Sequence, residues 1–504
     1  MLNVLKYFKF KSVLHENQLN KKPIFCFDFL QGFALIVIML NVLILISIFK
    51  PIFLNSNITY CFIFIIPMTL FIAYLTYEIY GDIITRNIIG WSIPFLIIFG
   101  GLAQLVSLTP HPNYFQRHAQ FSVVFNHSFI LAIILSIMIF FLQSMQNTLL
   151  LFCYRKINYK IFNTACKFLS FIFINAISVF LFYSLYYVLM KQINLKINLP
   201  NINYSLLCQI IISALLFLSL KPLIKWVRSK EELTLEGKNI ETYRYNWVSF
   251  FIKKNDEKLK IINEKITYRP RFIFNYLCGL SMAYMMFMLI SGTTVLKLIS
   301  LPFFTLSAGV LFVPFIYSCS NMMTEIYGYA ISRNMLWWYV FVSFIFTLFG
   351  MLIAYLPVPI SFTNNAIYKF ILGSMPRIFL AGTLGTICGL TTNNIIVSKL
   401  KKKLNGYHYW LRSIVSTCGG ELVYNIIAYP IMFFGLVTIH QFINIFISVS
   451  LFKLLMTACV WPLECYIARK LKFLEQTNVY DFDIIYSIFH LSIKKDIPYI
   501  NKND

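Results

Sequence analysis

The sequence predicts an all-α, polytopic integral membrane protein with about twelve transmembrane helices in two parallel six-helix repeats. Of its 504 residues, 59% are hydrophobic and only 12% are charged, whereas charged residues make up about a quarter of a soluble globular protein. Apolar runs of about 20 residues, the length that a helix needs to cross the hydrocarbon core, recur along the whole chain. These two observations exclude soluble enzymes and soluble binding domains as classes.

The apolar runs fall into two sets of six expected spans. The first set covers about 30–50, 57–77, 88–107, 127–150, 168–190 and 204–222. The second set covers about 273–291, 302–323, 335–356, 375–398, 413–438 and 441–467. We therefore expect an N-terminal leader (1–29), a first six-helix repeat (30–222), a charged linker (223–272), a second six-helix repeat (273–467) and a tail (468–504).

A third observation sets the arrangement of the two sets, because one stretch occurs twice. The chain reads YEIYGDIITRNIIGW at 77–91 and TEIYGYAISRNMLWW at 324–338. Glu78 and Glu325 are 325 − 78 = 247 positions apart, and the same offset aligns Arg86 with Arg333 without a gap. So dense a match indicates an internal duplication. An even number of spans per copy makes the two repeats parallel, related by an axis along the membrane normal.

The basic residues predict the orientation in the membrane. The formal net charge is +24, which could suggest a nucleic-acid partner, but no nucleic-acid-binding motif is present and the lysines and arginines collect in alternate loops. We therefore expect a lipid bilayer and no nucleic acid as partner, with both termini cytoplasmic and the chain in the inner (plasma) membrane. The basic groups are Lys6, Lys9, Lys11, Lys21 and Lys22; Arg155, Lys156 and Lys160; Lys399, Lys401, Lys402 and Lys403; and Arg469, Lys470 and Lys472.

Motifs for cofactor or metal chemistry are missing from the sequence. The eleven cysteines occur singly, and there is no HExxH pair, Gly-rich phosphate loop or ATP-binding motif. We expect no cofactor, no metal, no catalytic residues and no enzymatic activity.

Glu421 is the strongest candidate for a functional residue. An ionisable group inside a span costs about 2.5–3.5 kcal/mol on insertion scales, so it usually serves a substrate, an ion or a partner. It follows a run of small residues, Ser416 to Gly420, which let a neighbouring helix or a ligand approach closely. The alternative is a purely structural interhelical hydrogen bond.

Glu325 is the second intramembrane acid, at the end of the eighth span. It is followed eight residues later by Arg333, and the same pair recurs as Glu78 and Arg86. The recurrence suggests a structural hinge or an ion pair between Glu325 and Arg333 as much as a ligand site.

The tenth span carries an unusual set of polar and small residues. Arg377 lies in its first turn, where it either snorkels to the interface or contacts a substrate or carboxylate. Gly382, Gly385 and Gly389 are expected to form a close-packing face. A polar cluster follows, which either reads a base edge or joins helices: Thr391, Thr392, Asn393 and Asn394.

The order of these motifs resembles the queuosine precursor transporter family, also called vitamin-uptake-like transporters. The resemblance is carried by Pro314, Asn321-x-x-x-Glu325-x-Tyr327-Gly328, Arg333, Arg377-Ile378, a polar residue at 393, Trp410-Leu411-Arg412 and Ser416-Thr417. It covers the second half almost throughout and the first half mainly over 66–91. It implies six-helix units that import deazaguanine bases for tRNA modification.

Departures from the family pattern concern carboxylates. The family's Asp is replaced by Asn321, Asn393 and Tyr424, while Glu421 stands where the family has Gln or Asn. The first half has Tyr74, Gln146 and Ile130 at the positions of Asn321, Asn393 and Arg377, and its segment 168–190 lacks the Ser-Thr pair and the glutamate. The first half is therefore expected to be a scaffold and the second to hold the ligand.

These features together predict a transporter that imports a cyano- or aminomethyl-deazaguanine base, a purine-like small molecule. Glu421 would accept hydrogen bonds from the base, Asn393 and Asn394 would adapt to its edge, and an aromatic ring of Trp410, Tyr424 or Trp338 would stack on it. The resemblance adds Arg377, Glu325, Asn321, Ser416 and Thr417 to the expected substrate-binding residues.

Two alternatives stay open for the function, and one for the assembly. The chain could be a permease for another small heterocycle or vitamin on the same scaffold. It could also be a polytopic membrane enzyme or lipid-handling protein, which would need paired acids or histidine clusters facing one leaflet. The assembly is expected to be either a monomer of two fused repeats or a homodimer.

Overall fold

The computed structural model describes residues 29–54, 57–110, 118–156, 160–192, 201–231, 275–300, 305–360, 362, 365–433, 439–475, 477–481 and 484–489. The expected leader, most of the charged linker and the last fifteen residues lie outside this part of the chain. Within it, the prediction of an all-α, multi-pass membrane protein is confirmed: ten of the described helices are long and apolar enough to cross a membrane.

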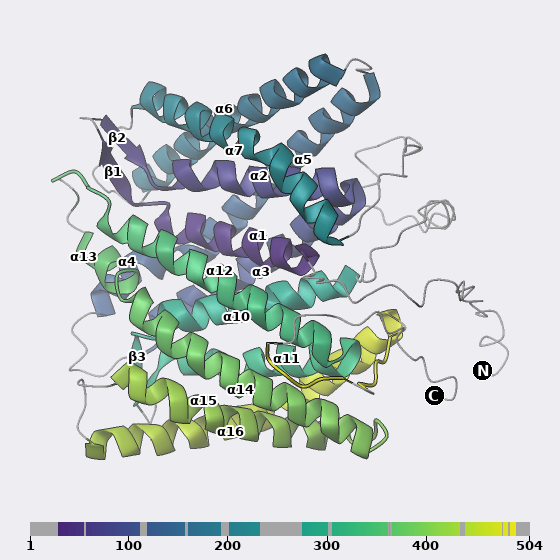
Figure 1. Cartoon of the computed structure of the whole chain (residues 1–504). Helices are drawn as coiled ribbons and strands as arrows, with labels where there is room; N and C mark the ends of the chain where they lie inside the picture. The colour runs from purple at the N-terminus through teal and green to yellow at the C-terminus, as the bar shows by residue number, and fades with distance from the viewer. Residues whose placement is uncertain are drawn as a thin grey trace, which may run out of the picture.

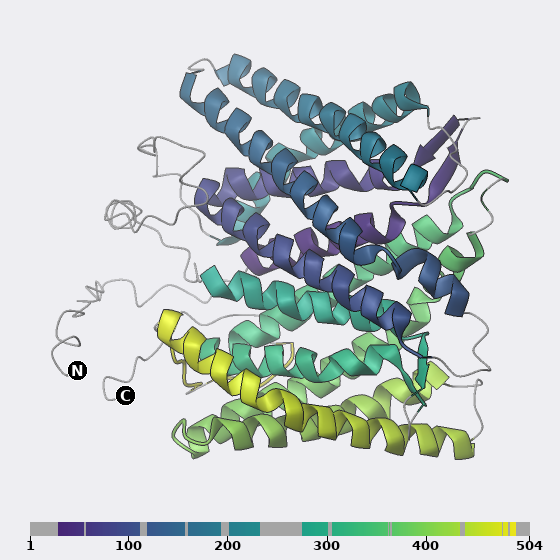
Figure 2. The same ribbon diagram turned by 180° about the vertical axis from the view of Figure 1, so that it is seen from behind.

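Long helices lie side by side, and their ends gather at two opposite sides of the molecule (Figures 1 and 2). The first half contains α1 (Phe29–Ser47), α2 (Phe62–Tyr80), α3 (Asp82–Leu108), α4 (His118–Phe125), α5 (Ser128–Lys156), α6 (Lys160–Gln192) and α7 (Ile202–Glu231). The second contains α10 (Asn275–Thr294), the 3-10 helix η3 (Ala308–Phe312), α11 (Val313–Tyr327), α12 (Tyr329–Tyr355), α13 (Asn365–Ile371), α14 (Met375–Lys403), α15 (Tyr409–Phe433) and α16 (Ile439–Glu475).

The two sides of the molecule differ in charge and in structure. We call the side where α1 begins and where α5, α7, α14 and α16 end the tail side (Figure 1). The basic residues at the ends of α14 and α16 lie there, which agrees with the expected grouping of basic loops on one side. The opposite side carries two β-hairpins, and we call it the hairpin side.

The two β-hairpins were not predicted from the sequence. β1 (Pro51–Leu54) pairs with β2 (Asn57–Tyr60), and β3 (Leu298–Ser300) pairs with β4 (Thr305–Ser307), both antiparallel. The expected second and eighth spans therefore began too early, because a short apolar strand cannot be distinguished from the first turn of a helix by its hydrophobicity. The helices start only after the hairpins, and α11 is entered through η3 with Pro314 in its first turn.

The elements of the two halves correspond at a constant distance along the chain. Helices α3 and α12 begin 329 − 82 = 247 residues apart and end 355 − 108 = 247 residues apart. Helices α5 and α14 show the same offset at both ends, and each half has its hairpin after the first helix. The offset read from one duplicated motif therefore extends through the architecture of both halves.

Contacts between the halves come in reciprocal pairs with the same offset. Helix α1 packs on α10 and α12, and α10 packs on α3. The ammonium of Lys50 donates to the carbonyls of Ile353 and Ala354 at the end of α12. At the offset position, Lys297 donates to the carbonyl of Val106 at the end of α3. Each buried lysine thus caps carbonyls that the other half's helix leaves unsatisfied at its C-terminus, where the helix dipole favours a cation.

Two tryptophans make the same exchange nearer to the tail side. A Cβ atom added to Gly32 of α1 would lie 2.6 Å from the ring of Trp338 of α12, and one added to Gly279 of α10 would lie 2.9 Å from the ring of Trp91 of α3. Each indole therefore needs a glycine opposite it. This contact assigns Trp338 to the interface between the halves.

Replacing either lysine should weaken the interface to a similar extent. Lys50→Met and Lys297→Met each leave buried carbonyl groups without a donor, so we expect each to lower the free energy of unfolding by about 1–3 kcal/mol. Thermal unfolding of the purified protein in detergent measures this effect. The exposed Lys470→Met serves as the control, and a large effect at only one of the two sites would contradict the reciprocal arrangement.

The same two lysines should make the stability depend on pH. Burial lowers the pKa of Lys50 and of Lys297 to about 8, from an ordinary value of 10.5. Between these values the unfolded chain binds more protons than the folded one, so stability rises as the pH increases from about 8 towards 10.5. We expect the melting temperature of the native chain to rise relative to that of the Lys50→Met/Lys297→Met double variant over this range. Parallel curves for the two proteins would refute this.

Candidate functional site

Three buried carboxylates lie inside the second half, and they differ in how well they are satisfied. They are Glu325 on α11, Glu421 on α15 and Glu464 on α16, each at most 3% exposed. A carboxylate in an apolar interior needs hydrogen bonds or counter-charges. Comparing the partners of the three therefore separates structural groups from candidates for ligand binding.

Glu325 is saturated by cations. Its two oxygens accept a bidentate pair of hydrogen bonds from Arg412, at 2.6 and 3.0 Å. Lys472 lies 2.5 Å from Oε1, and Lys401 lies 3.9 Å from the same oxygen while also donating to the Glu325 backbone carbonyl. This network joins α11, α14, α15 and α16 at the tail side. Glu325 acts here as a structural tie, and neither oxygen is left for a ligand.

Arg333 does not pair with Glu325, so the expected ion pair between them is wrong. Its guanidinium donates instead to the backbone carbonyls of Ile485 and Ser487, at 3.1 and 3.0 Å. The C-terminal segment that supplies these carbonyls comes from 150 residues further along the chain, which no local spacing could reveal.

The same C-terminal segment caps the start of α12. Asp481 accepts the backbone N–H of Tyr329 at 3.0 Å and the hydroxyl of Ser398 at 2.5 Å. Its Oδ1 would lie 2.8 Å from a Cβ at Gly328, whose φ of +88° also favours glycine. Burial raises the pKa of Asp481. The segment thus supplies the N-cap that Gly328 cannot.

Asn321 is the centre of a hydrogen-bonded network between α11, α14 and α15. Its amide nitrogen donates to the hydroxyls of Ser413 and Thr417, at 3.1 and 3.0 Å. Its oxygen accepts from Asn393 at 2.7 Å and from Ser416 at 3.5 Å. The structure therefore brings together four of the polar residues expected in the site.

Asn394 extends this network towards α12. Its oxygen accepts from Ser320, and its nitrogen donates to Ser332, both at 2.7 Å. Asn394 thereby has its strongest hydrogen bonds within the protein. Glu464, which the sequence analysis did not select, is likewise satisfied: its Oε1 accepts hydrogen bonds from Tyr409 at 2.6 Å and Ser413 at 2.7 Å.

Glu421 differs from the other two carboxylates. Its side chain is 3% exposed, and its Oε1 has no hydrogen-bond partner. It follows the closest approach of two helices, where a Cβ at Gly389 of α14 would lie 2.8 Å from the Gly420 carbonyl and 2.9 Å from the Tyr317 hydroxyl. The small residues before Glu421 do allow a close neighbour, as the sequence analysis expected. Of the expected glycine face, Gly385 and Gly389 lie in this contact, whereas a Cβ at Gly382 would meet nothing within 4 Å.

Other unpartnered polar atoms surround the same point. The hydroxyls of Tyr284 (α10) and Tyr317 (α11) and the side-chain oxygen of Asn393 (α14) are buried without a hydrogen-bond partner. Tyr317 lies close enough to Glu421 and to Tyr284 to interact with both electrostatically. Four helices therefore direct unsatisfied polar atoms to one place, which is unusual in a folded protein.

Lys453 on α16 is the basic residue of this site, and the sequence analysis missed it. It is 0% exposed, and its ammonium donates to Asn425 Oδ1 at 2.8 Å. It lies over the rings of Tyr424 and Tyr429, with centroids at 4.9 and 5.3 Å. Comparison of the halves offered a signal. The residues 247 positions before Tyr317, Glu421, Lys453 and Glu464 are Leu70, Ile174, Leu206 and Phe217.

The remaining expected residues lie at different distances from the site. Tyr424 contacts it, because its ring packs against Gly385 and under Lys453. Trp410 is 45% exposed beside Trp461, on the outer surface of the bundle. Arg377 is on the hairpin side, where it donates to the carbonyl of Ile431 at 3.2 Å. Trp410 and Arg377 are therefore separate from the polar atoms around Glu421.

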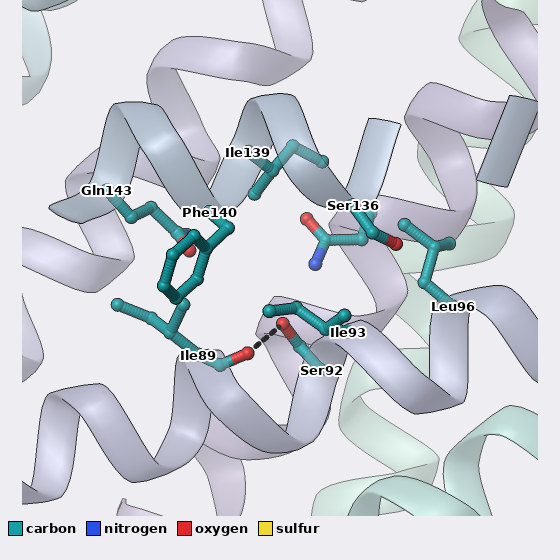
Figure 3. Close-up of a pocket in the computed structure, with 9 residues that line it drawn as sticks. Ile89, Ser92, Ile93, Leu96, Ser136, Ile139, Phe140 and Gln143 are labelled. Carbon is teal, nitrogen blue, oxygen red and sulfur yellow. Dashed lines mark hydrogen bonds between the residues drawn. The ribbon is translucent and has the colours of Figure 1, made fainter. Parts of the chain in front are cut away.

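The first half has a polar gap of its own, enclosing about 160 Å³ between α1, α3 and α5. Figure 3 shows Ser136, Phe140 and Gln143 of α5 facing Ile89 and Ser92 of α3. The side chains of Ser136 and Gln143 have no hydrogen-bond partner there. The residues that line the gap carry no charge, and they leave no room for a water molecule. This gap is a weaker candidate than the Glu421 site.

The fold and the site define a multi-pass membrane protein with a buried, incompletely satisfied polar site, which is typical of carriers of small polar solutes. Residues 307–467 match the family model described as "Putative vitamin uptake transporter". The match indicates uptake of a vitamin or another small molecule, and it includes all three buried glutamates. The chain matched no curated protein sequence and no solved structure.

One chemical change made at two glutamates should separate their roles. Glu325→Gln leaves three cations around a neutral amide, so we expect a loss of about 3–5 kcal/mol in the free energy of unfolding. Glu421→Gln removes a carboxylate that no hydrogen bond stabilises, so its melting temperature should stay within a few degrees of the native value. Thermal unfolding in detergent measures both, and equal losses would show that Glu421 is also a structural tie.

Proposed function

We propose that this chain imports a queuosine precursor, a cyano- or aminomethyl-deazaguanine base, across the inner membrane through the site around Glu421. The observation that carries the proposal is the unpartnered Oε1 of Glu421, 3% exposed in the middle of α15. Glu325 and Glu464 have their hydrogen-bond partners within the protein. A free acceptor in an apolar bundle is explained when a solute supplies the missing donor.

A deazaguanine base offers what the surrounding atoms need. Its lactam N–H and exocyclic amino group would donate to Glu421, and its carbonyl would accept from the hydroxyl of Tyr317 or Tyr284. Asn393 would meet the remaining edge with its unpartnered oxygen. The ring of Tyr424, which borders the site, would stack on the planar base. Asn321, Asn394, Ser416 and Thr417 would hold Asn393 and α15 in place through their network.

We further infer that the chain is one unit duplicated and fused, so that a single molecule contains its own twofold-like interface. The reciprocal bonds of Lys50 and Lys297 support this, since a twofold contact uses the same pair of surfaces in both directions. The first half would serve as the scaffold for the second. With the basic groups on the tail side, both termini would be cytoplasmic.

A permease for another small heterocycle or vitamin is the alternative that the family match favours directly. The same site would serve it, because any planar solute with two adjacent donors satisfies a carboxylate. Uptake of a labelled deazaguanine in the presence of unlabelled heterocycles separates the two functions. Competition by a vitamin at lower concentration than by the deazaguanine would favour the alternative.

Glu421→Gln should abolish uptake, because an amide can no longer accept two hydrogen bonds from the base while it offers donors of its own. The chain is expressed in a strain that must import its deazaguanine, the two bases are supplied separately, and queuosine in the tRNA is measured. We expect a loss of at least about a hundredfold, the effect of two lost hydrogen bonds to a charged group.

Glu421→Asp is the matched variant, since it keeps the carboxylate and moves it by one methylene. We expect it to retain measurable uptake. Normal queuosine with Glu421→Gln, at equal protein levels in the membrane, would overturn the proposed site.

A further inference from the structure

Lys453 and Glu421 form an opposite-charge pair that the fold holds apart. They lie on the adjacent helices α16 and α15, and each is the charged residue that acts electrostatically on the other. Among the described residues, no acid lies within 4.0 Å of Lys453 and no base within 4.0 Å of Glu421. The pair is thus close enough to compensate in charge but makes no direct bond.

Neighbouring groups fix the lysine, whereas the glutamate stays open. The ammonium of Lys453 is bound by Asn425, whose own amide donates to Ser450 at 3.0 Å. The faces of Tyr424 and Tyr429 provide further cation–π stabilisation. Asn425 is four residues after Glu421 on α15 and so lies on the same face of that helix. A solute bound to Glu421 would therefore meet a site whose positive charge is already in place.

We propose that Lys453 is a specificity-determining residue that makes this site selective for an uncharged planar heterocycle over a cationic one. The inference rests on the proposed function, and it selects between the two bases named there. The base with a nitrile substituent is neutral, whereas the base with an aminomethyl substituent carries an ammonium group at neutral pH.

The charge arrangement discriminates against the cation for two reasons. An ammonium group must lose its hydration to enter the bundle, and only an uncompensated carboxylate would repay that loss. Lys453 already compensates Glu421, and it also repels a second cation directly. The neutral base needs hydrogen bonds only, which Glu421 supplies together with the hydroxyls of Tyr317 and Tyr284.

The test is a ratio of uptake rates. Cells that depend on import receive either the nitrile base or the aminomethyl base, and initial uptake of each labelled base is measured. For the native chain we expect the nitrile base to be favoured by about tenfold or more. Lys453→Met should move the ratio by at least about tenfold towards the aminomethyl base, because Glu421 then has no compensating charge.

Three variants control for structural effects. Lys453→Gln keeps a donor for Asn425 but no charge, so it should change the ratio as Lys453→Met does, and it stands in if the methionine variant does not accumulate. Lys453→Arg keeps the charge and should keep the native ratio. Lys401→Met removes a buried lysine that belongs to the Glu325 network and should leave the ratio unchanged. A ratio does not depend on the amount of protein in the membrane.

The outcomes separate this inference from the proposed function. If the native chain favours the aminomethyl base, or if neither neutral variant changes the ratio while Glu421→Gln still abolishes uptake of both bases, Lys453 does not set the specificity. If the native chain imports neither base, the proposed function itself is refuted.

Discussion

The whole structure depends on the requirement that a polar group inside an apolar bundle finds a partner within the protein. Glu325 meets it with Arg412, Lys472 and Lys401, and this single carboxylate thereby joins four helices at the tail side. At the hairpin side, Lys50 and Lys297 meet it by capping helices of the opposite half. With so many groups satisfied at both ends, the unpaired oxygen of Glu421 between them points to a function.

Much of the fold could be predicted from the sequence because hydrocarbon imposes a strict pattern on it. The length of the apolar runs predicted helices such as α5 and α14 to within a few residues at their first turns. The scarcity of acids predicted that Glu421 and Glu325 are important, and the duplicated motif gave an offset that both hairpins and the helices of the halves follow.

The rest could not be predicted, because it depends on which helices become neighbours. The spacing of Glu325 and Arg333 suggested an ion pair, yet Arg412 from α15 binds the acid and the C-terminal segment binds Arg333. Lys453 was one lysine among many in the sequence, and only the packing of α15 against α16 places it near Glu421. Charges are partnered across helices, and periodicity along one helix carries no information about that choice.

The asymmetry between the halves follows from their small residues. In the second half, Gly385 and Gly389 let α14 approach α15 at Gly420, and this contact places Tyr317 against the backbone beside Glu421. The equivalent positions of the first half hold Met138, Leu142 and Phe173, side chains too large for such an approach. The first half has also lost the acid and the lysine, which stand as Ile174 and Leu206. Loss of the close helix contact and loss of the charges belong together, because a carboxylate is tolerated there only beside a packed polar site. The half that kept its glycines is the one that could keep a ligand.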